Sequence, residues 1–317
     1  YLTFDVEIWC GGWQDLDQRF PSSFQRYVYG GSVQGGYALP KTLEILDKHK
    51  LHGVFFVEPL FAGRFGVEHL ATVVSLIQQA GQEVQLHLHP EWADEIRPLP
   101  FPGAVKKRQH LSYYSLDEQV ALISLGKRLL AEAGCSEVQT FRAGSFAANA
   151  DTYRALESCH IGIDSSLNRC QPESAPDLRE SNYFDYPSQI GNVVQIPITV
   201  FEDGFGQLRP AQIGACGFTE MREAIESAAS RGDKHFMMLS HNFEMLRPGR
   251  TDPDPIVVRR FESLCAYLDD NRNSYQTTGL SSRADITLDS TVSGRPKVSS
   301  LATGRRLVEQ GIRRIVG

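Results

Sequence analysis

Short apolar segments alternate with longer segments of helical periodicity along most of the chain. Polar residues rarely interrupt the apolar segments, which is typical of strands in a parallel sheet covered on both faces. Such strands are predicted at residues 2–8, 54–57, 83–88, 138–141, 161–164, 193–198, 235–239 and 275–278. Segments of helical character separate most of them.

Several of the predicted helices carry recognisable end signals. Pro40 is a first-turn proline, and Gly81 ends a helix predicted over about residues 67–80. Ser115 and Glu118 have the spacing of a capping box that opens a long helix. Further helices are predicted to begin at Asn149, after Thr219 and at Pro255, and a short basic helix is predicted near 303–315.

Repeated strand–helix units predict an α/β protein with a buried parallel sheet, either a barrel or a doubly wound layer. The strands form one series, and no Gly-x-Gly-x-x-Gly turn follows the first, which favours the barrel. We expect a single (β/α) barrel domain over residues 1–280, with long βα loops at 10–39, 90–114 and 241–254. Residues 281–317 are predicted to form a C-terminal appendage of unassigned role.

Two predicted strands carry pairs of reactive side chains at alternating positions. Asp5 and Glu7 lie in the first, and His87 and His89 lie in the third. Residues i and i+2 of a strand point to the same face, so each pair faces one side of the sheet. Carboxylates and imidazoles that face one space are the ligands of a hydrolytic divalent-metal site.

Other reactive residues also end or follow predicted strands, namely Glu58, Arg142, Asp164 and His241. The carboxyl-terminal rim of a βα-barrel is where active sites are built. Structural alternatives exist: His87 and His89 can be buried histidines satisfied by partners, and Asp5 with Glu7 can be a strand-end pair satisfied by loop amides. Arg142 can simply bridge a carboxylate. Taken as a set, their positions favour an active site.

Composition narrows the function without specifying it. Hydrophobic residues make up 41% of the 317 residues and the net charge is −6, so neither nucleic acid nor an anionic membrane is a predicted partner. No apolar stretch approaches the ~20 residues of a spanning helix. The six cysteines are scattered and form no C-x-x-C pair, which is typical of reduced packing residues in a cytoplasmic protein.

The three tryptophans, Trp9, Trp13 and Trp92, lie within a few residues of the acidic and histidine pairs. Because the amphipathic indole ring often forms a wall for a sugar, Trp9 and Trp92 are candidate substrate-binding residues. Packing within the loops is the alternative.

Four ordered motifs carry a family resemblance. They are Thr3–Glu7, Glu83–Pro90, Phe141–Phe146 with the downstream segment Gly162–Leu167, and Leu239–His241. In this order they resemble the polysaccharide deacetylase (NodB-homology) family, and in particular a branch linked to O-antigen and other cell-surface polysaccharide synthesis. The resemblance runs from residue 2 to about residue 278 and implies a distorted barrel of about seven strands.

The resemblance also implies roles for individual residues. Asp5 would be the general base, held by Arg142, and His241 the general acid. Glu7 and His87 would be metal ligands. In the same way, Asp164 would adjust the acid or the base.

This chain departs from the family pattern at two places. Val6 separates Asp5 from Glu7, whereas the family has adjacent aspartates, and strand parity still places both carboxylates on one side. The usual histidines are four residues apart, a spacing that would pair His87 with Glu91. Parity favours His89 as the third ligand, with Glu91 as the alternative third ligand or a substrate-binding residue.

The predicted function is that of a metal-dependent hydrolase that removes an N-acetyl group from a sugar or glycan. Imidazole with carboxylate suits one Zn²⁺ ion and also admits Co, Ni, Mn or Fe. The alternatives are a hydrolase of a non-sugar cyclic amide and a non-catalytic glycan-binding relative. The sequence predicts no oligomeric state.

Overall fold

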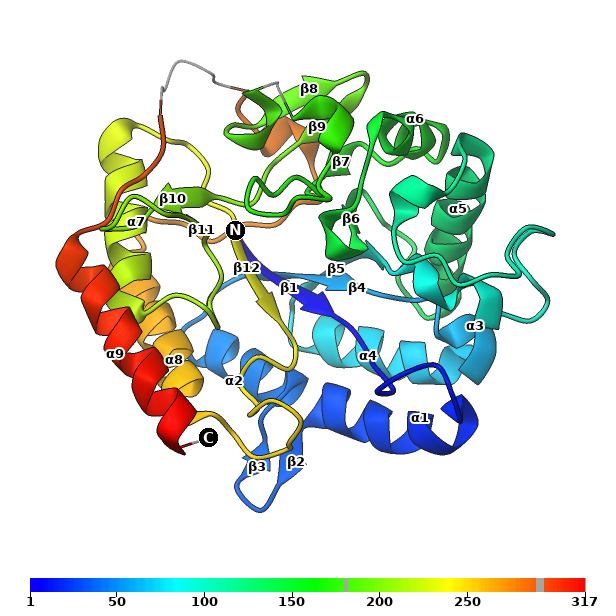
Figure 1. Cartoon of the computed structure of the whole chain (residues 1–317), viewed down its shortest axis with the longest axis horizontal. Helices are drawn as coiled ribbons and strands as arrows, with labels where there is room; N and C mark the ends of the chain where they lie inside the picture. Colours follow the sequence, from blue (N-terminus) through cyan, green and yellow to red (C-terminus); the bar gives the residue numbers. More distant parts are fainter. Residues whose placement is uncertain (180–181, 289–293, 317) are drawn as a thin grey trace.

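An eight-stranded sheet forms the centre of the computed structural model, which describes residues 1–179, 182–288 and 294–316 (Figure 1). The strand order is β12-β1-β4-β5-β6-β7-β9-β8. All neighbours pair in parallel except β8 (Ser188–Ile190), which is antiparallel to β9. The parallel strands are β1 (Leu2–Val6), β4 (Gly53–Val57), β5 (Glu83–Leu88), β6 (Thr140–Ala143), β7 (Ile163–Asp164), β9 (Val193–Gln195) and β12 (Met238–His241).

Backbone hydrogen bonds from the segment 196–213 bring the two ends of the sheet together. The Thr199 amide donates to the Met237 carbonyl at 3.1 Å, and the Leu239 amide donates to the Ala211 carbonyl at 2.9 Å. The segment bonds to the central sheet only at isolated positions, so it completes the curled sheet without adding a strand to it. The predicted distorted (β/α) barrel of about seven parallel strands, in a single domain, is therefore confirmed.

Helices cover the outside of the sheet. They are α1 (Leu16–Phe24), α2 (Leu39–Lys48), α3 (Ala62–Phe65), α4 (Val67–Gln79), α5 (Leu116–Glu132), α6 (Ala150–Ser158), α7 (Phe218–Arg231), α8 (Pro255–Asp270) and α9 (Ser300–Val316). Single turns occur at Gln25–Tyr29, Pro90–Glu95, Leu111–Tyr113, Gly144–Phe146, Pro176–Leu178, Asn182–Phe184 and Arg283–Asp285, and two small hairpins at β2 (Gly31–Ser32) with β3 (Gly35–Gly36) and β10 (Val200–Glu202) with β11 (Leu208–Pro210). The predicted capping box at Ser115 is present.

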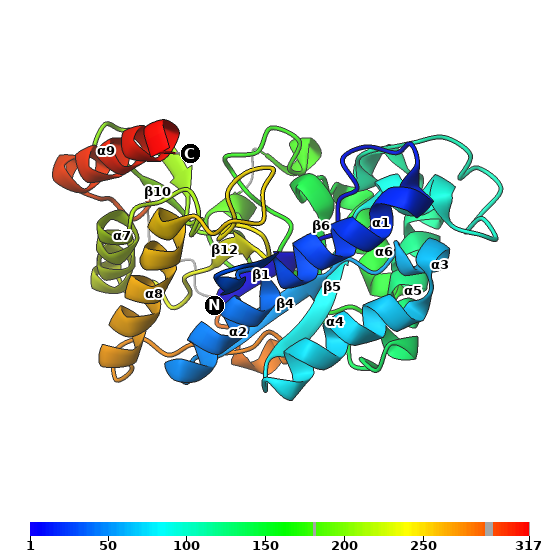
Figure 2. The same ribbon diagram turned by 90° about the horizontal axis from the view of Figure 1, so that it is seen from below.

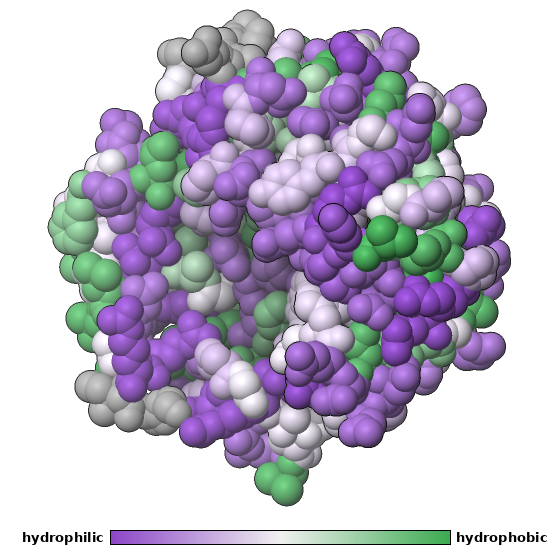
Figure 3. All heavy atoms as spheres, turned by 45° about the vertical axis from the view of Figure 1, so that its right-hand side comes forward, coloured by the Kyte–Doolittle hydropathy of each residue, from purple (hydrophilic) through white to green (hydrophobic). Residues whose placement is uncertain are grey.

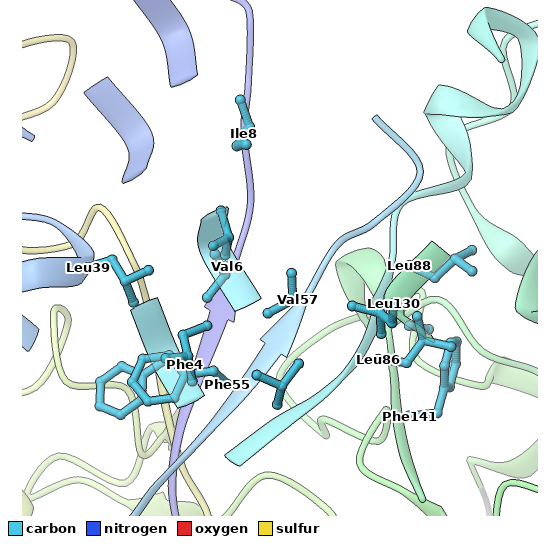
Figure 4. Packing of buried hydrophobic residues seen from close by; sticks show 14 of the residues in the cluster. Phe4, Val6, Ile8, Leu39, Phe55, Val57, Leu86, Leu88, Leu130 and Phe141 are labelled. Atoms are coloured by element: carbon cyan, nitrogen blue, oxygen red, sulfur yellow. The ribbon is translucent and has the colours of Figure 1, made fainter. Parts of the chain in front are cut away.

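Alternate side chains along each strand point to opposite faces of the sheet, so one set forms the hydrophobic core and the other lines the barrel interior. On β1, Phe4 and Val6, followed by Ile8, point outward into the layer between sheet and helices, where the Phe4 and Phe55 rings stack at 4.8 Å (Figure 4). The alternate residues Thr3 and Asp5 point into the barrel. The same alternation on β5 turns its leucines outward and His87 inward.

Two sequence predictions fail at the level of elements. Residues 275–278 form no strand, and the Thr277 hydroxyl instead accepts a hydrogen bond from the His52 amide. The predicted loop 10–39 contains α1, whose Phe20 ring stacks on Phe65 at 3.8 Å. All six cysteines are free thiols.

The C-terminal helix α9 packs beside α7 and α8 (Figure 2). Its Arg306 is buried and bonds Glu220 of α7 at 3.0 Å and Asp203 at 3.2 Å. The division of the chain at residue 280 stays a prediction. None of the helices in the described part of the chain is long and apolar enough to cross a membrane.

The surface mixes hydrophilic and hydrophobic residues. On the face shown in Figure 3, hydrophilic residues predominate and surround a hollow near the centre.

Candidate active site

Glu7, His87 and His89 converge inside the barrel. Glu7 Oε1 lies 3.0 Å from His87 Nε2 and 2.9 Å from His89 Nε2. All three side chains are buried, and their donor atoms lie within 4.8 Å of one another. The parity of β5 therefore brings both histidines to the carboxylate that follows β1.

The Nδ1 atoms of both imidazoles, on the side away from Glu7, have hydrogen-bond partners of their own. His87 Nδ1 donates to the Arg142 carbonyl at 2.8 Å, and His89 Nδ1 faces the Glu91 carboxylate at 3.3 Å. A proton on each Nδ1 leaves the Nε2 lone pair of a neutral ring directed at Glu7. Glu91 thus lies on the opposite side of His89 from Glu7 and outside this group of three donor atoms.

The electrostatics of this cluster favour a cation. Burial by itself would raise the pKa of Glu7, but the neighbouring His89 and His87 hold it well below its usual range. Burial opposes charge on His89 as well, yet Glu7 and Glu91 raise its pKa well above its usual range. The carboxylates around His89 therefore stabilise positive charge beside Glu7, either as a proton on His89 or as an ion that the three donor atoms would hold. One carboxylate and two imidazoles fit a divalent transition ion such as Zn²⁺.

Asp5 lies beside this cluster and is held by a buried arginine. Arg142 Nη1 donates to Asp5 Oδ1 at 2.5 Å, while Asp5 Oδ2 lies 4.0 Å from His87 Nε2. Arg142 is fixed by further hydrogen bonds to the Thr3 hydroxyl at 3.0 Å and to Ser165, and its guanidinium lies over the Phe56 ring. One oxygen of Asp5 is therefore anchored and the other faces the cluster.

His241 completes the arrangement from β12. Its Nε2 lies 4.0 Å from Glu7 Oε1, and its Nδ1 bonds Glu244 Oε1 at 3.0 Å. Burial lowers the pKa of His241, but the hydrogen bond to Glu244 and the charges of Glu7, Glu244 and Asp5 raise it to about 9. With a side chain 21% exposed, His241 is the most accessible member of the cluster.

Glu244 is a functional candidate that sequence reasoning missed. It accepts hydrogen bonds from the Gln212 side chain at 2.5 Å, the Gly214 amide at 2.7 Å and the Ser240 hydroxyl at 3.1 Å. These donors fix its carboxylate against His241. The three-residue spacing from His241 was a possible signal, but the turn that makes it meaningful was not predicted.

Asn242 and Gly144 are two further residues of the site that the sequence did not indicate. The Asn242 side chain accepts from the Glu7 amide at 3.1 Å and donates to the Glu7 carbonyl at 3.2 Å, which fixes the end of β1 against β12. A Cβ on Gly144 would lie 2.6 Å from His89 Nδ1. Glycine is therefore required there for the imidazole to approach the backbone.

The structure does not bring Asp164 to the group of donor atoms, and its role in adjusting the acid or the base stays a prediction. Its neighbour Ile163 faces the barrel interior, so Asp164 points outward, where Tyr153 of α6 donates to it at 3.0 Å. Ser166 donates through its amide and its hydroxyl. Burial raises the pKa of Asp164 to about 6. Glu58 does not belong to the group of three donor atoms; it accepts from the Leu60 amide at 2.8 Å, and burial raises its pKa to about 8.

The tryptophans divide into different roles. Trp9 Nε1 donates to Glu7 Oε2 at 2.6 Å, and its ring meets His89 edge-on at 4.8 Å. Trp92 is only 1% exposed, and its ring packs against the Trp13 ring at 4.9 Å. This ring therefore supports the neighbouring loop and is not presented to a ligand. Trp13 is half-buried and lies under the Lys107 ammonium at 3.6 Å.

The fold is shared with solved structures, although the sequence matches no family model and no curated protein. A Mycobacterium smegmatis protein provisionally described as a polysaccharide deacetylase superposes with a TM-score of 0.51 at 18% identity, over 86% of this chain and 87% of that one.

Two other similar structures are enzymes by description. A family 4 carbohydrate esterase from Streptomyces lividans, in complex with acetate, superposes with a TM-score of 0.44 at 12% identity. The match covers 93% of this chain and 96% of that one. A peptidoglycan deacetylase from Bacillus subtilis superposes with a TM-score of 0.40 at 13% identity, over 100% of this chain and 96% of that one. The first comparison supports the barrel fold.

Proposed function

We propose that this chain is a metal-dependent hydrolase that removes an N-acetyl group from a sugar. The observation that carries the proposal is the convergence of Glu7, His87 and His89, with both imidazole Nδ1 atoms engaged elsewhere. This arrangement leaves three donor atoms for one divalent ion. We assign the third ligand to His89 and an orienting role to Glu91, and Zn²⁺ is the preferred ion.

A divalent ion held there would supply Lewis acidity to an acetyl carbonyl and to water. Asp5 acts as the general base through Oδ2, because Arg142 occupies Oδ1. The Arg142 guanidinium also fixes the orientation of the Asp5 carboxylate. The base is thereby presented to the same space as the ligands.

His241 acts as the general acid that protonates the leaving amine. Its raised pKa keeps the imidazolium form available at neutral pH, and Nε2 faces the cluster while Glu244 holds Nδ1. Trp9 forms part of the wall beside His89, where an indole face suits a sugar ring. Asp164 is left out of the reaction because it points away from the cluster.

The sequence motifs also bear on the substrate and on the cellular process in which the protein acts. Their resemblance to the O-antigen branch supports a role in cell-surface polysaccharide synthesis, with an N-acetylated glycan or glycan precursor as the substrate. We propose that the protein works in the cytoplasm.

Acetate release from N-acetylated sugars by the metal-reconstituted protein tests this function. Asp5→Asn should lose most of the activity and still bind metal, as measured by elemental analysis. His89→Ala should lose metal, whereas Glu91→Gln should keep part of it. Full turnover in Asp5→Asn would remove that residue from the base role, and turnover of cyclic amides alone would replace the proposed substrate.

A further inference from the structure

Five arginines from three separate segments line a groove beside the candidate active site. The groove consists of two adjoining cavities of about 370 Å³ and about 480 Å³ that share Arg247, Pro248 and Arg313. The arginines are Arg26 from the helical turn Gln25–Tyr29, Arg247 and Arg250 from the loop between β12 and α8, and Arg313 and Arg314 from α9. In Figure 1 the end of α9 lies next to the loop between β12 and α8, and Arg313 of α9 pairs with Asp254 of that loop.

Arginines outnumber carboxylates among the described residues that line the groove. Glu244 and Asp254 are the carboxylates among the described lining residues. Asp254 caps α8 through the Ile256 amide and pairs with Arg313, while Glu244 is engaged with His241. Because the whole chain carries a net charge of −6, this local excess of positive charge is not a general property of its surface.

One arginine in the groove also has an unsatisfied donor. Arg26 Nε is buried and has no hydrogen-bond partner among the described residues, while the Arg26 guanidinium is held 5.0 Å from the Tyr27 ring. Buried donors in folded proteins almost always have an acceptor. The Arg26 side chain would have to turn for this donor to reach an acceptor in the cavity, and an anionic ligand would supply one.

The groove begins directly behind the proposed general acid. Glu244 and Phe243 line it, and the Phe243 ring lies 5.2 Å from the His241 ring. Tyr27, another lining residue, accepts a hydrogen bond from Asn242 through its carbonyl. Phe243 and Glu244 are thus the residues past which a group attached to a sugar at His241 would reach the arginines.

We propose that this groove binds the diphosphate of an activated sugar, so that the substrate is a sugar diphosphate ester. The proposal rests on the deacetylase function proposed above. Guanidinium groups bind phosphate oxygens in pairs through parallel N–H donors, and several arginines around one cavity suit a group with more than one negative charge. A neutral oligosaccharide would leave this charge unused.

Calorimetric titration with inorganic diphosphate, at about 0.15 M salt, tests the binding site. The R247Q/R250Q double variant should bind about 10-fold more weakly or worse, because each lost charged hydrogen bond contributes on that scale. The exposed Arg250→Gln alone should weaken binding in the same direction. Arg305→Gln is the matched control, since this exposed α9 arginine lines neither cavity.

Three results of the titration would overturn the groove as the binding site. The first is an absence of binding by the unmodified chain, and the second is an equal loss of affinity in Arg305→Gln. The third is a loss of binding in a H87A/H89A variant, which would place the diphosphate on the metal. Retained binding in that variant supports the groove.

Acetate release separates this proposal from the function on which it rests. A nucleoside diphosphate N-acetylhexosamine should show a kcat/KM at least about 10-fold above that of the methyl glycoside of the same sugar. R247Q/R250Q should abolish this advantage and leave the methyl glycoside rate unchanged. Equal rates for both substrates overturn the diphosphate proposal, whereas no turnover of either, with intact diphosphate binding, overturns the deacetylase function alone.

The diphosphate could come from a nucleotide or from a lipid carrier. A short isoprenyl diphosphate derivative of the same N-acetyl sugar forms the third arm of the rate measurement. A higher kcat/KM than the methyl glycoside with either diphosphate supports the proposal, and the better of the two identifies the source.

Discussion

At the scale of single residues, Glu244 determines the acidity of His241. Its hydrogen bond to His241 Nδ1 contributes to a pKa of about 9. Replacing the carboxylate by a neutral amide of the same shape removes a negative charge, so the pKa of His241 should fall. The proposed general acid then loses its proton at a lower pH.

Glu244→Gln should therefore lose activity from the alkaline side. We expect the upper limb of the pH profile of kcat/KM to move down by about 1 to 2 pH units, as for the loss of an adjacent opposite charge. Glu44→Gln, an exposed carboxylate of α2 paired with Lys41, is the control and should leave the profile unchanged. An unmoved limb in Glu244→Gln would show that Glu244 only fixes the turn.

Asp164 makes stability depend on pH in the opposite sense from an ion-paired carboxylate. Burial raises its pKa from 3.8 to about 6, so the folded state favours the protonated form. Its contribution to the free energy of unfolding is fully present below about pH 4 and is lost as the pH rises through about 6. The difference in pKa corresponds to about 3 kcal/mol.

Comparison of the chain with Asp164→Asn isolates this contribution. The unfolding free energy of the unmodified chain, relative to the variant, should rise by up to about 3 kcal/mol as the pH falls from 7 to about 4. Urea unfolding across that range measures it, with the more exposed Asp151→Asn as the control. A constant difference between chain and variant would contradict a raised pKa.

At the scale of elements, the turn after β6 makes room for His89. Gly144→Ala would place a Cβ 2.6 Å from His89 Nδ1, and the imidazole would have to move. We expect a loss of metal affinity of at least about 10-fold, the usual cost of disturbing the surroundings of a ligand. Metal titration measures it, and Gly311→Ala, which meets open space on α9, should bind normally.

The alternation of side chains along strands explains how much could be predicted from the sequence. It placed Asp5, Glu7, His87 and His89 on one side without structural information, because the period of a strand is fixed. The same rule places Asp164 outside once Ile163 is known to point inward, which the short strand β7 did not reveal.

The missed elements depend on contacts between distant segments. Helix α1 has no side-chain cap and contains Pro21, so its local signals are weak and its packing against α3 sustains it. Glu244 meets His241 only because a turn follows β12, and two of its other donors come from the distant residues 212 and 214. Such contacts have no signature in a single sequence.

At the scale of the whole molecule, α9 is joined to the barrel by buried charges. Arg306 bonds both Asp203 and Glu220, and Arg306→Met would leave two buried carboxylates unpaired. We expect a loss of about 3–5 kcal/mol in the free energy of unfolding by urea. Arg305→Met, one residue earlier on the exposed face, should change it by less than about 0.5 kcal/mol. Equal effects would mean that the buried pairs contribute nothing.

The exposure of His241 has a consequence for how the ion comes and goes. Glu7, His87 and His89 have side chains at most 9% exposed, so an entering or leaving ion passes the more open imidazole of His241. A sugar seated over His241 would block that path. A chelator should then strip the ion more slowly while product is bound, so that each turnover protects the centre from demetallation.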